Sequence, residues 1–232
     1  MGLIDSVRVM GAMARITAPT LVDVLRDDLD RHSVDERARW FGRRVIELLD
    51  VQLIATGADQ VPTDRAYVYM SNHQSHLDIP ILYATLPSPT IRMLGKKELF
   101  AIPLWGRGLR AAEFIEVDRS NHARAMKSID YAARLVADGV SIYLAPEGTR
   151  SRDGTVGKLK KGGFHLALET KAPIVPVAIR GTIDILPRGA RVMQTGRTVK
   201  VTIGAPIIVE GRDMTGLMTD VGTFLKAHVE GP

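Results

Sequence analysis

The chain has 232 residues and a net charge of +5, with 45% hydrophobic residues, 25% charged residues and no cysteine. This composition excludes a disordered chain, and the missing cysteines exclude disulfides, thiolate metal ligands and a thiol nucleophile. One α/β core with a helical attachment fits the length best.

Residues 1–50 are predicted to form a helical segment ahead of an α/β domain that spans residues 51–232. A mostly apolar helix with two arginines is expected over residues 3–16, and it suits either a bilayer interface or ordinary packing on the domain. Pro19 predicts the first turn of a second helix, and a capping box formed by Ser33 and Glu36 predicts the start of a third. No apolar run is long enough to predict a membrane-spanning helix.

The polar residues 71–78 lie between two apolar runs, and this pattern predicts a strand, a loop and a helix. Residues five apart on a helix point about 140° away from each other, so His73 and Asp78 can meet only if His73 lies in the loop. Asp78 would then accept the proton of one imidazole nitrogen and leave the other as a general base. Alternatively, Asp78 does no more than complete a capping box with Ser75.

Histidine and acidic side chains in this loop also suit a metal ion in principle, with His73, His76 and Asp78 as ligands. The six histidines of the chain include no H-E-x-x-H spacing. We therefore expect no metal.

Strands and helices alternate along the rest of the chain, which is typical of a largely parallel sheet with helices on both faces. Strands are predicted at 66–70, 91–94, 114–118, 141–145, 174–178 and 199–203, and helices at 79–86, 121–138 (capped by Ser120), 164–170 and 214–225. The segment 106–111 matches the glycine fingerprint of dinucleotide folds, but it lacks a strand directly before it. Close packing of the glycines is the preferred interpretation.

The turn at 146–154 combines glycines, hydroxyls and arginines at the end of a predicted strand. Guanidinium groups match phosphate and carboxylate oxygens bidentately, so the turn is a candidate anion receptor, with a solvated loop as the alternative. Lysines at 158–161 precede a predicted helix, where they would help its free N–H groups to hold an anion, or would simply be solvated.

These motifs together resemble the signature blocks of the glycerolipid acyltransferase family, whose best-known members are the lysophosphatidate acyltransferases. His73 and Asp78 resemble the first block, and residues 146–150 resemble the third. Residues 114–119 look like the second block and residues 174–178 like the fourth. Four blocks in the expected order make the resemblance specific.

The resemblance implies transfer of a fatty acyl chain from acyl-CoA or acyl carrier protein to the hydroxyl of lysophosphatidate, giving phosphatidate in phospholipid synthesis. His73 and Asp78 would be catalytic, and no cofactor is expected beyond the acyl thioester. The residues implied in substrate binding are Glu147, Gly148, Thr149, Arg150, Arg119 and Lys161. A membrane lipid as acceptor favours the interface for residues 3–16, with their arginines reaching the headgroups. The implied location is the cytoplasmic face of a membrane, as a peripheral or monotopic protein.

Three alternatives remain open: acylation of another lysolipid, hydrolysis by a serine nucleophile at Ser75 or Ser71, and lipid binding without turnover. The chain has no G-x-S-x-G motif, which weakens the hydrolase hypothesis. Residues 92–171 hold 15 lysines and arginines against 9 acidic residues, which suits anionic lipid headgroups. Nucleic acid is not an expected partner, because aromatic residues make up 5% of the chain and no nucleic-acid motif is present.

Overall fold

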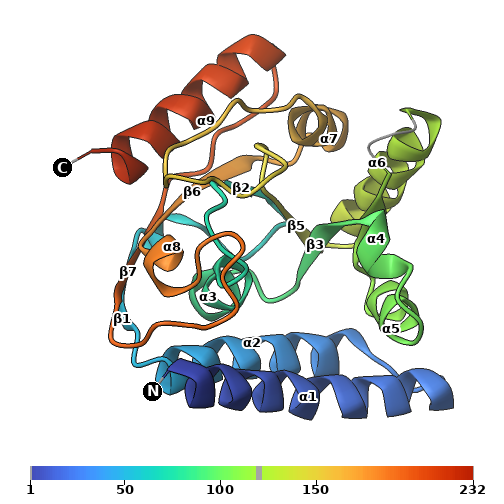
Figure 1. Ribbon diagram of the computed structural model, residues 1–232. Helices are drawn as coiled ribbons and strands as arrows, with labels where there is room; N and C mark the ends of the chain where they lie inside the picture. Colours follow the sequence, from blue (N-terminus) through green and yellow to red (C-terminus); the bar gives the residue numbers. More distant parts are fainter. Residues whose placement is uncertain (1, 119–121, 232) are drawn as a thin grey trace.

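The computed structural model describes residues 2–118 and 122–231, in which one seven-stranded sheet is covered by helices on both faces (Figure 1). The strand order is β1-β7-β6-β2-β5-β3-β4, and every neighbouring pair is parallel except β6 with β7. The strands are β1 (Gln52–Thr56), β2 (Val68–Ser71), β3 (Ile91–Lys96), β4 (Ile115–Val117), β5 (Ser141–Leu144), β6 (Ile174–Arg180) and β7 (Thr198–Ile203). This confirms the predicted α/β fold with a largely parallel sheet.

The longer helices are α1 (Gly2–Arg26), α2 (Arg31–Leu48), α3 (Asp78–Thr85), α6 (His122–Ala137), α7 (Gly162–Thr170) and α9 (Met214–Val229). Short helices are η1 (Ala58–Gln60), α4 (Lys97–Phe100), α5 (Trp105–Ala111) and α8 (Thr182–Ile185). The sequence analysis did not predict β1, η1, α4, α5 or α8. β1 is an edge strand with mostly exposed side chains, and the short helices span too few residues to show a helical period.

Two hydrophobic layers lie on opposite faces of the sheet. Tyr67 and Tyr69 pack into the layer beside α2 and α3, whereas Val68 and Met70 pack into the layer beside α7 and α9 (Figure 1). Successive side chains of a strand point to opposite faces, so this short segment contributes to both layers. The central strands β2, β5 and β6 are buried on both faces and therefore read as continuous apolar runs.

The prediction of two helices separated near Pro19 was wrong, because residues 2–26 form the single helix α1. Val9, Ala12 and Val24 are buried along its length, and the Thr20 hydroxyl donates a hydrogen bond to the Ile16 carbonyl at 2.7 Å. Tertiary packing on both sides of the proline thus keeps the helix continuous where the local signal predicted an end. Within residues 2–118 and 122–231, no helix has the length and apolar character needed to cross a bilayer.

Helix α2 begins earlier than the predicted capping box implied. Asp30 is its N-cap, and the Asp30 carboxylate accepts hydrogen bonds from the Ser33 backbone N–H at 2.8 Å and the Ser33 hydroxyl at 2.9 Å. Ser33 therefore lies inside the first turn rather than at the cap. The predicted Ser120 cap of α6 lies outside the described residues.

A buried ion-pair cluster ties α2 to the sheet. Arg92 in β3 is fully buried and donates to the Asp35 carboxylate at 2.5 Å, while Glu113 lies 3.6 Å from its other terminal nitrogen. The Thr90 hydroxyl donates to the second Asp35 oxygen at 2.7 Å. Buried charges of this kind require partners, so the cluster fixes α2 relative to β3. Val9 of α1 and Phe41 of α2 belong to the same hydrophobic cluster as side chains of the strands. The predicted boundary between a helical segment of residues 1–50 and an α/β domain of residues 51–232 stays a prediction.

Gly42 allows α2 to pack closely on α3. A Cβ atom at this position would overlap the Pro80 carbonyl oxygen of α3. We expect Gly42→Ala to lower the free energy of unfolding by about 1–3 kcal/mol, because the two helices must move apart. Urea denaturation followed by circular dichroism measures the change.

The control is Gly11→Ala in α1, where a Cβ meets no atom within 4 Å. Alanine is the better helix former, so this variant should gain roughly 0.5–1 kcal/mol. A Gly42→Ala protein as stable as the wild type would contradict the packing argument.

Candidate active site

His73 lies in the loop between β2 and α3, where the sequence analysis expected it, and its ring faces Asp78. His73 Nδ1 is 2.7 Å from Asp78 Oδ2, and the imidazole remains partly exposed whereas the carboxyl group is fully buried. An ionised Asp78 accepts the Nδ1 hydrogen, which leaves Nε2 with a free lone pair. The arrangement is that of a general base with its orienting carboxylate.

Asp78 also holds the loop in shape. Its Oδ2 atom accepts the backbone N–H groups of Gln74 at 2.8 Å and Ser75 at 3.0 Å, and its Oδ1 atom accepts the Thr182 hydroxyl at 2.6 Å. Asp78 therefore pairs with His73 and also accepts the Ser75 N–H, one of the contacts of a capping box, but the N-cap of α3 is Leu77, which has no side-chain cap. A buried carboxylate needs this many donors to remain charged.

Glu147 joins the turn after β5 to the histidine loop. Its Oε1 atom accepts the His73 backbone N–H at 2.8 Å, and its Oε2 atom accepts the Gly157 N–H at 2.6 Å. The Ser151 N–H donates to the His73 carbonyl at 2.7 Å, so both backbone groups of His73 are bound by this turn. Since both Glu147 oxygens face the protein backbone, the geometry favours a positioning role, and direct contact with substrate stays a prediction.

Asn72 connects the same loop to β6. Its side-chain amide donates to the Ile179 carbonyl at 2.8 Å, and its oxygen accepts the Ile179 N–H at 2.8 Å. His73, Glu147 and Thr182 thus follow the neighbouring strands β2, β5 and β6 at their carboxyl ends, the edge at which open parallel sheets place their sites.

Arg150 lies partly buried beside this pair of catalytic candidates. Burial and the neighbouring Arg188 guanidinium lower the pKa of Arg150, while the Asp78 carboxylate acts in the opposite direction. In residues 2–118 and 122–231, no carboxylate forms an ion pair with Arg150. A partly buried guanidinium group that has no ion-pairing carboxylate and is influenced by a second positive charge favours an anionic ligand.

The remaining predicted binding residues fall in different places. Gly148 adopts a φ of 73° in the turn, a conformation that suits glycine, and Thr149 is exposed next to it. Lys161 precedes α7 with an exposed side chain, and the adjacent Lys160 N–H donates to the Pro146 carbonyl at 2.9 Å. Arg119 lies outside the described residues, so its binding role stays a prediction.

The two serines of the hydrolase hypothesis are buried and have other partners. Ser71 donates to the Asn72 carbonyl at 2.7 Å, and Ser75 donates to the Leu186 carbonyl at 2.8 Å. Both hydroxyl groups serve the architecture of the loop, and their burial gives a substrate no access to them. In the described part of the chain, no three His, Asp or Glu side chains converge as metal ligands.

Sequence reasoning missed Asn72, Thr182 and Arg188. Thr182 lies 104 residues from Asp78, and the partner of Asn72 lies 107 residues away. Among these three residues, only Asn72 had a feature in the sequence that could have indicated a role, because it is a polar residue directly after an apolar, strand-like run. The other two residues lie in α8 and the loop that follows it, where no motif was apparent.

Comparisons with known proteins give the family of the chain. A family model described as Acyltransferase matches residues 52–180. A chloroplastic 1-acyl-sn-glycerol-3-phosphate acyltransferase of Brassica napus is 33% identical over 68% of this chain and 46% of its own length. The alpha form of that enzyme from Ovis aries is 31% identical over 71% of this chain and 57% of its own length. The chain thus spans about half the length of these curated relatives.

A solved structure, that of a 1-acyl-sn-glycerophosphate acyltransferase from Thermotoga maritima, superposes with a TM-score of 0.84 at 26% sequence identity. It covers 99% of this chain and 95% of its own. The family resemblance drawn from the four sequence blocks is confirmed.

Glu147 should leave a signature in the pH dependence of stability. Burial raises the pKa of Glu147 above the usual value of about 4.3, against two backbone hydrogen bonds that lower it. The folded state therefore binds this proton more tightly than the unfolded state. The stabilisation that the protonated carboxyl group contributes is complete below its pKa in the unfolded state. This stabilisation is lost as the pH rises through the higher pKa of the folded state.

Comparison of the wild type with Glu147→Gln isolates this effect. We expect the free energy of unfolding of the wild type, relative to that of the variant, to fall as the pH rises from the unfolded-state pKa of Glu147 through its folded-state pKa. Urea denaturation at several pH values measures this change. Glu169→Gln, at an exposed position of α7, should show no such trend. A relative gain by the wild type over the same window would refute the argument.

Proposed function

Because the chain belongs to the acyltransferase family, we propose that it transfers a fatty acyl chain from an acyl thioester to the free hydroxyl of lysophosphatidate, giving phosphatidate in phospholipid synthesis. The observation that carries the proposal is the 2.7 Å contact between His73 Nδ1 and the buried Asp78 carboxylate. The names of the similar proteins from Brassica napus and Thermotoga maritima support the choice of acceptor.

His73 acts as the general base in this reaction. Its Nε2 atom takes the proton of the acceptor hydroxyl while the hydroxyl oxygen attacks the thioester carbonyl carbon. Asp78 keeps the ring in the required tautomer and stabilises the imidazolium that forms. The tetrahedral intermediate then expels the thiolate, which takes the proton back from His73. The acyl group thus passes directly to the acceptor, and no serine ester is formed.

Arg150 and Arg188 hold the acceptor phosphate. The electrostatic effect of Arg188 on Arg150, together with the missing ion-pairing carboxylate for Arg150, supports a bound anion, and a phosphomonoester offers two negative charges to two guanidinium groups. Placed beside His73, such a phosphate would bring the glycerol hydroxyl of the acceptor to the base. Holding both substrates in line contributes much of the rate.

The acyl donor is acyl-CoA or acyl carrier protein, and both act as co-substrates without a further cofactor. We place the protein at the cytoplasmic face of a membrane, as a peripheral or monotopic enzyme. The exposed apolar side of α1 supports this location: Leu3, Ile4, Val7, Met10 and Leu25 are 62–67% exposed.

Substitution of His73 tests the base. His73→Ala should reduce the release of thiol from palmitoyl-CoA in the presence of lysophosphatidate by about 10²–10⁴-fold, because proton transfer in the transition state is lost. The matched control is His165→Ala, which removes an exposed histidine of α7 and should retain full activity. A folded His73→Ala protein with nearly normal turnover would refute the assignment, and thiol release that needs no acceptor would favour hydrolysis.

Substitution of Arg150 tests the phosphate site. Arg150→Gln should lower kcat/KM for lysophosphatidate by about ten- to a hundredfold, the value of one charge-assisted hydrogen bond to a phosphate. With a monoacylglycerol acceptor, which has no phosphate, the variant and the wild type should differ little. Arg152→Gln, at an exposed position two residues away, is the control. Equal losses with both acceptors would contradict a phosphate-binding role.

A further inference from the structure

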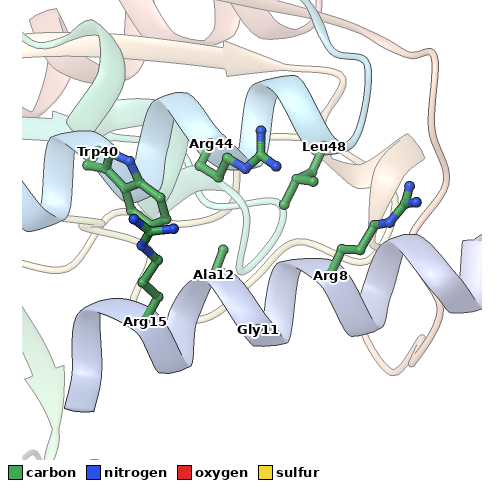
Figure 2. A pocket seen from close by; sticks show the side chains of 7 residues that line it. All are labelled: Arg8, Gly11, Ala12, Arg15, Trp40, Arg44 and Leu48. Atoms are coloured by element: carbon green, nitrogen blue, oxygen red, sulfur yellow. The ribbon is translucent and has the colours of Figure 1, made fainter.

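A cavity of about 580 Å³ lies between α1 and α2 (Figure 2). Its lining residues all come from these two helices: Arg8, Gly11, Ala12, Arg15, Trp40, Arg44 and Leu48. Of the residues in the proposed chemistry, His73 lies in the loop after β2, Asp78 is the first residue of α3, and Arg150 lies in the turn after β5. The cavity is therefore a second site, and neither its residues nor its helices take part in the chemistry proposed above.

The spacing of the lining residues explains why the cavity exists. On α1 they follow the i, i+3, i+4, i+7 pattern from Arg8 to Arg15, and on α2 they follow i, i+4, i+8 from Trp40 to Leu48. Each helix thus presents one continuous stripe to the other. Gly11 and Ala12 are the smallest residues of the α1 stripe, so the space opens opposite Arg44 and Leu48 (Figure 2).

Three arginines provide the charge of the cavity. The Arg15 guanidinium stacks 5.2 Å from the centre of the Trp40 ring, and no carboxylate in the described part of the chain pairs with it. Arg8 is paired only loosely with Asp5, at 3.5 Å, and Arg44 is paired with Glu47 at 2.8 Å. The cavity therefore keeps a surplus of positive charge over the two acidic residues at its rim.

The exposed apolar residues of α1 adjoin this charge. Ile4 and Val7 are exposed, and they precede Arg8 and Gly11 by four residues, which places them one helical turn away on the same side of α1. A phosphate with acyl chains attached satisfies both features, since guanidinium forks bind the phosphate and the apolar side chains enter the acyl region. Tryptophan is likewise favoured at the boundary between headgroups and acyl chains.

We propose that the cavity between α1 and α2 binds the phosphate headgroup of an anionic membrane phospholipid, separately from the acceptor in the active site. Such a site would hold α1 at a fixed depth and rotation in the interface. Because α2 is fixed to β3 through Asp35 and Arg92, a lipid bound here would also orient the catalytic edge of the sheet relative to the membrane.

Vesicle binding tests the proposal. Cosedimentation is measured with vesicles of phosphatidylcholine alone and with vesicles that contain phosphatidylcholine and phosphatidylglycerol in equal amounts. The substitutions Arg8→Gln, Arg15→Gln and Arg44→Gln together should weaken binding to the anionic vesicles about tenfold or more. The charge-matched control, Arg65→Gln with Lys171→Gln and Lys226→Gln, removes three exposed charges outside α1 and α2 and should change binding no more than about twofold.

Tryptophan fluorescence distinguishes a lipid from free phosphate. The chain has two tryptophans, so Trp105→Phe leaves Trp40 as the sole reporter in the cavity. Soluble short-chain phosphatidylglycerol should change its emission saturably, and inorganic phosphate at the same concentration should not. An equal response to phosphate would overturn the lipid assignment.

Two further results would also overturn the proposal. One is equally tight binding of the wild type to neutral and anionic vesicles, and the other is an equal loss of vesicle binding in the triple arginine variant and the charge-matched control. His73→Ala should bind vesicles like the wild type. Failure of the proposed enzyme activity would therefore leave this test unaffected.

Discussion

The buried carboxylate of Asp78 is the constraint on which the rest of the site depends. It accepts hydrogen bonds from the His73 ring, two backbone N–H groups of the same loop and the Thr182 hydroxyl. A fully buried carboxylate without such donors would cost several kcal/mol. The loop must therefore adopt the one conformation that supplies them, and this conformation points the imidazole toward solvent with Nε2 free.

The loops around this carboxylate are tied together by pairs of hydrogen bonds. Glu147 brings the turn after β5 to the backbone of His73, and Asn72 makes two hydrogen bonds with Ile179 in β6. The proposed base and the proposed anion site come from different parts of the chain and are thus held together by these hydrogen bonds. Because buried polar networks must be complete to be stable, the same contacts that support the fold also set the geometry of the site.

Arginine side chains gather in two separate regions of the molecule. Arg150 and Arg188 gather positive charge at the catalytic edge of the sheet, and the arginines between α1 and α2 gather it beside an exposed apolar helix face. The buried cluster of Arg92, Asp35 and Glu113 fixes α2 to the sheet between these regions. The proposed lipid contacts of the helices and the proposed phosphate contacts of the loops would therefore have a defined relative orientation.

The sequence by itself determined the alternation of strands and helices, the position of His73 in a loop, and its pairing with Asp78, because these depend on apolar periodicity and on residues five positions apart. Only the tertiary structure decided the continuity of α1 through Pro19, the hydrogen bonds of Glu147, Asn72 and Thr182, and the place of Arg188 near the site. Glu147, Asn72 and Thr182 form hydrogen bonds with residues 74 to 107 positions away along the chain, and no local pattern encodes such contacts. They arise when the parallel sheet brings the carboxyl ends of β2, β5 and β6 to one edge, where buried polar groups must find partners.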